Sequence, residues 1–69
     1  MRFRAYTQKG FNQEKFYVED ENERDLIVQA DNAEEARAYF ERYIYETSLY
    51  STEETAVWLE ENPLYVVEC

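Results

Sequence analysis

The hydrophobic periodicity of this chain changes at Asp31, and this change constrains the fold more than any other feature. Before it, apolar and polar residues alternate, as in the run from Phe3 to Thr7, and such alternation predicts β-strands. After it, apolar residues recur every three or four positions from Ala33 to Thr47, which predicts an amphipathic helix. Strands followed by helices are typical of the α+β class.

Three strands are predicted in the first part of the chain, at residues 3–7, 15–19 and 26–30. A turn at 8–13 and an acidic loop at 20–25 separate them. These short connections predict an antiparallel meander. A fourth strand is predicted at 64–68, and because it is apolar on both faces we expect it in the interior of the sheet.

Two helices are predicted before the last strand, each from its own capping signal. Asp31 or Asn32, followed by glutamates, begins a helix over 32–48, and Ser51-Thr52-Glu53-Glu54 begins a second one that ends near Asn62. The order β-β-β-α-α-β predicts a single domain, 1–69, with an antiparallel sheet of about four strands and two helices on one face. The predicted core consists of Phe3, Phe16, Val18, Leu26, Val28, Phe40, Tyr43, Leu59 and Val66.

Charge is distributed unevenly along the chain. The net charge is −9, and no lysine or arginine follows Arg42, whereas six carboxylates lie in residues 43–69. Because self-repulsion destabilises a compact state, we interpret this excess as a functional anionic surface. Direct binding of nucleic acid needs basic patches and is not expected. The expected partner is a basic protein, such as a nucleic-acid-binding protein or complex.

The second predicted helix concentrates this charge on one face. At about 100° per residue, its four glutamates fall within about a third of the circumference, with Val57 among them. Glu60 and Glu61 lie near the C-terminal end, where the helix dipole disfavours anions. Simple solubility is the alternative reading of this face. The candidate partner-binding surface, extended by Glu46 or by the acidic loop, comprises Glu53, Glu54, Val57, Glu60, Glu61, Glu46, Glu19, Asp20, Glu21 and Glu23.

The first predicted helix differs, because its charges are expected to neutralise one another. Arg37 and Glu41, and likewise Arg42 and Glu46, are separated by four residues. Residues at this spacing are neighbours on a helix surface and form ion pairs when their charges are opposite.

Several classes of function are excluded by the residue inventory. There is no histidine, one glycine and one cysteine, Cys69, so no catalytic residues, cofactor site or metal site are predicted, and an enzyme is not expected. The 19–25 loop lacks the ligand spacing of a calcium loop. No apolar run is long enough to span a membrane, and no signal peptide follows Met1. A cytoplasmic protein, monomeric or homodimeric, is expected.

The segment LIVQADNAEEARAYF, residues 26–40, resembles a pattern in small acidic phage- and plasmid-encoded proteins. In those proteins a hairpin leads into a helix that opens with Glu-Glu-Ala, here Glu34-Glu35-Ala36. The resemblance implies a source in mobile genetic elements. It also implies a protein that inhibits a host defence system, such as CRISPR, or DNA-processing machinery in the cytoplasm of a bacterial host.

Two functions remain open on the sequence. The first is a nucleic-acid mimic, whose carboxylates occupy a cationic groove of a partner in place of phosphates. The alternative is an interaction or assembly module without mimicry, which acts through Tyr17, Tyr45 and Tyr50 or through a sheet edge. Salt distinguishes them, because it screens an electrostatic interface and affects an aromatic one little.

Overall fold

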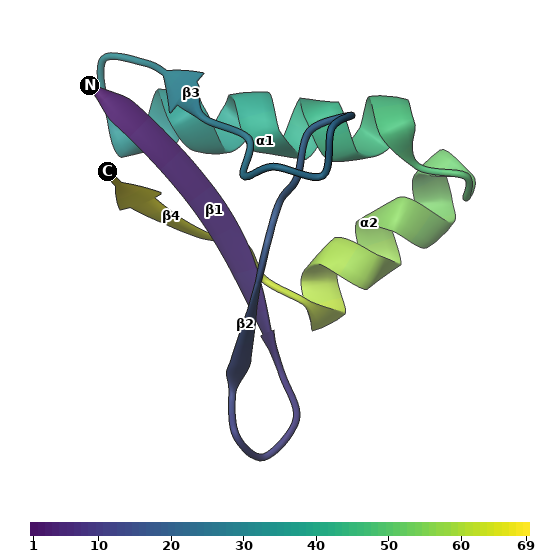
Figure 1. Cartoon of the computed structure of the whole chain (residues 1–69). Helices are drawn as coiled ribbons and strands as arrows, with labels where there is room; N and C mark the ends of the chain where they lie inside the picture. The colour runs from purple at the N-terminus through teal and green to yellow at the C-terminus, as the bar shows by residue number, and fades with distance from the viewer.

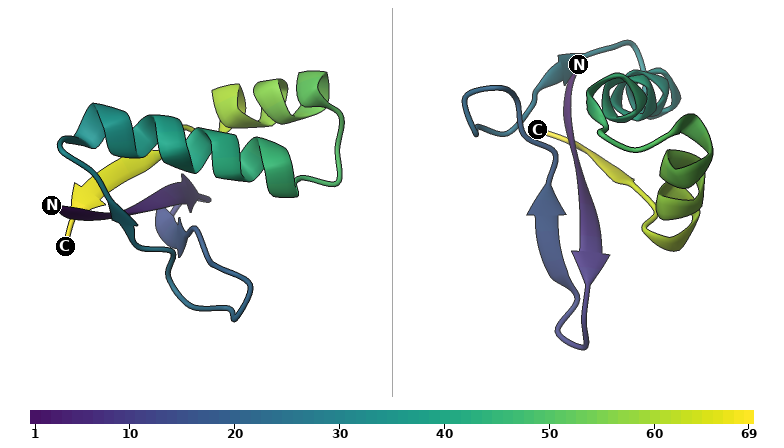
Figure 2. Two further views of the ribbon diagram at one scale, coloured as in Figure 1. Left: turned by 90° about the horizontal axis from the view of Figure 1, so that it is seen from above. Right: turned by 90° about the vertical axis from the view of Figure 1, so that its right-hand side faces the viewer.

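The computed structural model describes residues 1–69 and confirms the α+β class, with a four-stranded antiparallel sheet and two helices. Both helices lie in one layer on the same side of the sheet, and the hairpin of the first two strands extends away from them (Figures 1 and 2). The elements are β1 (Arg2–Lys9), β2 (Glu14–Tyr17), β3 (Val28–Gln29), α1 (Ala33–Thr47), α2 (Thr52–Glu61) and β4 (Tyr65–Glu68).

β1 is the central strand and pairs antiparallel with each of the other three. Phe3 pairs with Val28 of β3 and also with Glu68 of β4. Since a strand has two edges, β3 and β4 lie on opposite sides of β1. Tyr6 likewise pairs with one residue of β2 and one of β4, so β2 also lies opposite β4. β2 and β3 therefore lie along the same edge of β1.

The predicted meander is therefore wrong, because β3 pairs with β1 and not with β2. Val18 donates its backbone N–H to the carbonyl of Ala5 at 2.8 Å, and Leu26 then donates to the carbonyl of Val18 at 2.8 Å. Between these two residues the chain leaves the sheet as a loop, closed by a bridge between Glu19 and Asp25. β2 and β3 are thus two parts of one interrupted strand along β1.

The predicted interior position of the last strand is also wrong, because β4 pairs only with β1 and forms an edge of the sheet. The apolar residues on its two faces contact different parts of the protein. Val66 packs against the core on the helix side, while Tyr65 lies on the open side against the ring of Tyr6, with ring centroids 5.3 Å apart. A strand can be apolar on both faces when an aromatic cluster covers its open side.

The core lies between β1, α1 and the residues that lead into β4. It confirms Phe3, Val28 and Phe40 as buried, while Val18, Leu26, Leu59 and Val66 pack around it partly exposed. Buried Ala5, Ala30 and Leu64 were not predicted as core residues. The buried apolar residues are Phe3, Ala5, Val28, Ala30, Ala36, Phe40 and Leu64.

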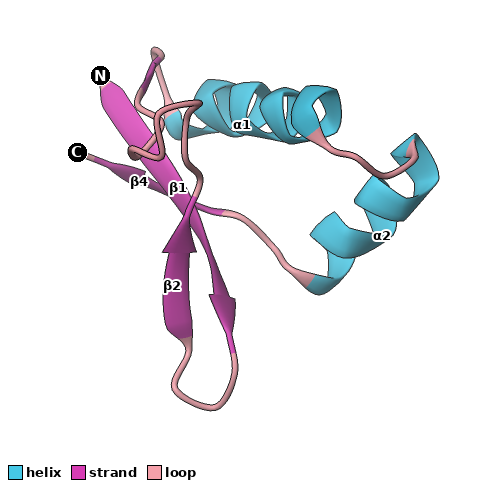
Figure 3. Cartoon of the chain, turned by 45° about the vertical axis from the view of Figure 1, so that its right-hand side comes forward, coloured by secondary structure: helices cyan, strands magenta, loops and turns pink.

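Phe16 is the clear error in the predicted core, since 47% of it is exposed. Its register opposite Thr7 turns it toward the helix side, as predicted. However, the β1–β2 hairpin extends beyond the helix layer (Figure 3), so no helix covers the ring completely. Tyr43 is also only half-buried, because its hydroxyl reaches the surface and donates to the carbonyl of Glu19 at 3.1 Å.

Both helices begin at the predicted caps. The Asn32 side chain accepts the backbone N–H of Glu35 at 2.8 Å, and the Ser51 hydroxyl accepts that of Glu54 at 3.2 Å. Each cap satisfies one of the N–H groups that have no partner at a helix N-terminus. The helix boundaries therefore agree with the prediction to within one residue.

Replacing Asn32 with alanine should lower the free energy of unfolding by about 1 kcal/mol, because the Glu35 N–H loses its acceptor. For a domain of this size that loss corresponds to a fall of about 4–8 °C in melting temperature. Thermal unfolding followed by circular dichroism measures it. Asp31→Ala is the matched control, and an equal fall in both variants would show that Asn32 has no special role as the cap.

Candidate partner-binding site

The four glutamates of α2 are all exposed, as predicted. None takes part in an ion pair, since the single ion pair of the protein joins Arg4 and Asp25 at 3.3 Å. Val57 is 53% exposed among them. The opposite side of the helix turns Thr55 into the core, where it is buried. We refer to Glu53, Glu54, Val57, Glu60 and Glu61 as the α2 acidic face.

The ion pairs predicted on α1 do not form. Arg37 instead donates to the carbonyl of Leu64 at 2.7 Å, and the guanidinium of Arg42 lies 5.9 Å from the ring centroid of Tyr39. An exposed ion pair contributes at most about 1 kcal/mol, whereas a partly buried carbonyl without a hydrogen bond is costly. The carboxylates of α1 are therefore no more neutralised than those of α2.

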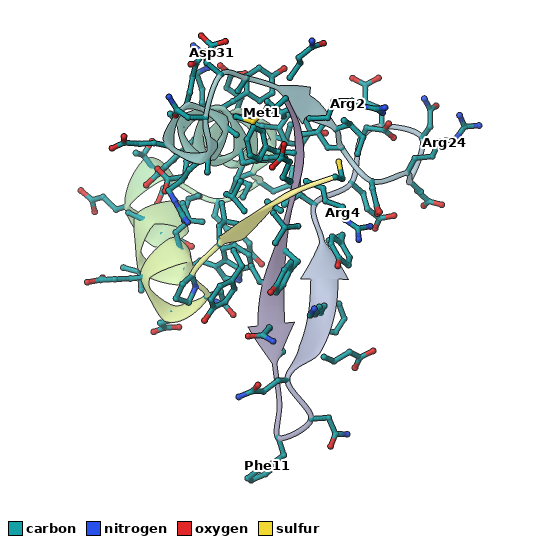
Figure 4. The ribbon with its side chains drawn as sticks, turned by 90° about the vertical axis from the view of Figure 1, so that its left-hand side faces the viewer. Met1, Arg2, Arg4, Phe11, Arg24 and Asp31 are labelled. Carbon is teal, nitrogen blue, oxygen red and sulfur yellow. The ribbon has the colours of Figure 1, made fainter.

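Residues 20–25 of the acidic loop do not extend the α2 acidic face. Figure 4 shows Arg24 of this loop on the opposite side of β1 from α2. Asp20 is used within the loop, where its side chain accepts the N–H groups of Asn22 at 2.8 Å and Arg24 at 3.2 Å. Glu21 and Glu23 are exposed.

Glu46, the other predicted extension, is exposed on α1. It lines a shallow hollow together with Tyr39, Arg42 and Tyr43. Tyr43 is also the α1 residue that contacts the loop, through its hydrogen bond to Glu19. Glu46 therefore lies on the flank of α1 that faces the loop.

A groove of about 470 Å³ lies between the β1–β2 hairpin and the two helices. It was not predicted from the sequence. We call it the hairpin–helix groove. Glu19 contributes to it from the loop, and Trp58 contributes from α2. The only sequence signal for it was an excess of aromatic residues over the needs of so small a core. It is lined by Thr7, Lys9, Phe16, Tyr17, Val18, Glu19, Tyr43, Ile44, Thr47, Ser48, Tyr50, Thr55, Trp58 and Leu64.

Aromatic rings and buried hydroxyls shape this groove. The Lys9 ammonium lies 5.8 Å from the ring centroid of Phe16 and 5.7 Å from that of Trp58, so it links the hairpin to α2 by cation–π contacts. Buried Thr55 donates to the Ser48 hydroxyl at 2.9 Å and connects α2 to the end of α1. These contacts connect the hairpin, α2 and the end of α1 around the groove.

The open side of the sheet carries a row of tyrosines. Tyr6 lies between Tyr17 and Tyr65, with ring centroids 5.3 Å away on each side. Arg4 lies 4.3 Å from the ring centroid of Tyr17, and Lys15 lies 4.8 Å from that of Tyr6. Cations and neighbouring rings thus already contact these tyrosines. We therefore interpret the row mainly as a structural layer on the side of the sheet that no helix covers.

No family model, curated protein or solved structure matches this chain. The candidate site therefore rests on the geometry described above. Neither helix has the length and apolar character that would let it cross a membrane.

Metal ions should have no effect on stability. No three aspartate, glutamate or cysteine side chains cluster to form a metal site, and Asp20 already accepts two backbone N–H groups. We expect millimolar calcium or zinc to leave the melting temperature unchanged, as measured by differential scanning fluorimetry. A ligand that binds only the folded state raises this temperature, so a rise of several degrees would contradict the expectation and point again to the 19–25 loop.

Proposed function

We propose that this protein binds the cationic groove of a nucleic-acid-binding protein and thereby inhibits it, with the α2 acidic face in the place of phosphates. One observation carries the proposal. The four carboxylates of α2 are exposed on one side of the helix, and none forms an ion pair. A face that no lysine or arginine neutralises retains its full charge for an external partner, although Glu54 also accepts a hydrogen bond from the Ser51 hydroxyl at 3.3 Å.

The spacing of these carboxylates suits mimicry. Glu53 and Glu60 are about 10 Å apart along the axis, because a helix rises about 1.5 Å per residue. That span is close to three times the axial rise of about 3.4 Å per phosphate of one DNA strand. Glu54 and Glu61 form a second row beside the first. Exposed Val57 between the rows adds an apolar contact that phosphates do not offer, and so adds specificity.

The resemblance of residues 26–40 to small phage- and plasmid-encoded proteins supports a partner in host defence, such as a CRISPR effector, or in DNA processing. The α2 acidic face fits the common property of such partners, a groove lined by lysine and arginine. In this function the protein acts as a monomer or homodimer and needs neither a cofactor nor catalysis.

Competition with DNA tests the proposal. The immobilised protein is incubated with nuclease-treated bacterial lysate, and bound proteins are eluted either with salt or with a short DNA duplex. Mimicry predicts that the captured proteins are basic and that the duplex releases them at low ionic strength. Capture that persists in the presence of excess duplex would contradict mimicry.

A second candidate, an interaction module that uses tyrosines, is favoured by the exposure of Tyr50 at 69% and Tyr45 at 37%. Tyr17, the third tyrosine predicted for this role, is half-buried beneath Arg4. This candidate predicts capture that resists both salt and DNA. The same elution experiment therefore separates the two functions.

A further inference from the structure

The hairpin–helix groove is much larger than the hollow beside Glu46, and the α2 acidic face does not explain it. Its volume of about 470 Å³ is within the range of about 300–1,000 Å³ that is usual for ligand sites. Its floor includes buried Thr7, Thr55 and Leu64. Its rim includes Tyr50, which is 69% exposed and has no core contact to explain an aromatic residue there. These features fit an apolar side chain as occupant.

The groove adjoins the α2 acidic face. At about 100° per residue, Glu54 follows Trp58 around the helix by about 40°, and Glu61 follows Glu54 by about 20°. Trp58 forms a wall of the groove. The two carboxylates therefore border that wall, and a partner that contacts both of them extends over the groove.

The charges of the rim identify the occupant. By helix geometry Glu54 and Glu61 border the Trp58 wall, whereas the lining itself holds one residue of each charge: Glu19, whose backbone carbonyl accepts from Tyr43, and Lys9, whose ammonium is already engaged with two rings. The local field therefore favours a cationic segment. We infer that the hairpin–helix groove receives one large apolar side chain from a cationic segment of a protein partner. This inference rests on the proposed function and adds an anchor residue to it.

Such an anchor is typical of protein interfaces, where one large side chain in a central pocket carries much of the affinity. The carboxylates would attract and orient the segment, and the groove would discriminate among basic sequences. Nucleic acid offers no side chain of this kind. The groove thus gives a reason why the surface combines carboxylates with aromatic residues.

Two synthetic peptides test the inference, Gly-Lys-Lys-Ser-Trp-Ser-Lys-Lys-Gly and the same sequence with glycine in place of tryptophan. Their dissociation constants are measured by isothermal titration calorimetry near physiological salt, and their position is located by NMR shifts of backbone amides. We expect the tryptophan peptide to bind about tenfold more tightly. We also expect it alone to shift the amides of Thr7, Thr55 and Leu64, which line the floor.

Variants separate the groove from the acidic face. Tyr50→Ala removes part of the rim and should reduce the tenfold ratio to about two, while the matched control Tyr45→Ala, whose ring is outside the groove, should leave it unchanged. Glu54→Lys with Glu61→Lys should weaken both peptides and preserve the ratio. Equal affinity of the two peptides for the unaltered protein overturns the groove inference, and salt-sensitive binding of both peptides would still agree with the proposed function.

Discussion

Phe40→Ala is expected to leave the chain largely unfolded at room temperature. Phe40 is the one large side chain that is completely buried, where α1 meets the sheet. Removing a buried phenylalanine ring costs about 3–5 kcal/mol, because the ring leaves a cavity as well as losing its burial. A small domain has a total stability of only about 5 kcal/mol, so this loss is comparable to the whole.

Phe16→Ala is the matched control, because it makes the same chemical change at a ring that is 47% exposed. We expect it to cost about 1 kcal/mol, in proportion to the smaller apolar area that it uncovers. Far-ultraviolet circular dichroism and urea titration measure both variants. Similar unfolding midpoints for Phe40→Ala and the unaltered protein would show that the helix register is wrong.

The helices were predictable because their signals are local. Asn32 and Ser51 accept N–H groups three residues ahead, so the sequence around each cap already contains both partners. The burial of Ala36 and Phe40 follows from the same periodicity. The α2 acidic face was predictable for the same reason, because helix geometry alone places its carboxylates on one side.

The sheet order and the groove depend on contacts between distant residues, which no local pattern contains. The pairing of Phe3 with both Val28 and Glu68 joins three distant segments. Arg37 donates to the carbonyl of Leu64, 27 residues away, and does not pair with the carboxylate of Glu41 in its own helix. The groove exists because the β1–β2 hairpin extends past the helix layer. How far the hairpin extends relative to the helices depends on how the elements pack, which no local pattern specifies.

Reversing two charges of the α2 acidic face should abolish most partner binding. Glu54→Lys with Glu61→Lys replaces two attractions of up to about 1 kcal/mol each with repulsions of similar size. The sum of up to about 4 kcal/mol corresponds to as much as about a thousandfold loss of affinity for the partner captured from lysate. Both side chains are exposed, so circular dichroism should show an unchanged fold. Affinity is measured by biolayer interferometry.

Glu21→Lys with Glu23→Lys is the control for this result. It changes the net charge by the same amount, but its residues lie in the loop on the other side of the sheet from α2 (Figure 4). We expect a loss of about threefold or less, from the long-range field alone. An equal loss in both variants would show that the partner responds to net charge and not to this face.

The salt dependence of partner binding tests whether the partner is bound through the α2 acidic face. The dissociation constant is measured at several salt concentrations for the unaltered protein, the loop variant and the α2 variant, and its logarithm is plotted against the logarithm of salt concentration. Each charge contact that displaces a counterion contributes about one to the slope. We expect equally steep slopes for the unaltered protein and the loop variant, and a slope lower by about two for the α2 variant. One common slope for all three proteins would contradict a partner bound through the α2 acidic face.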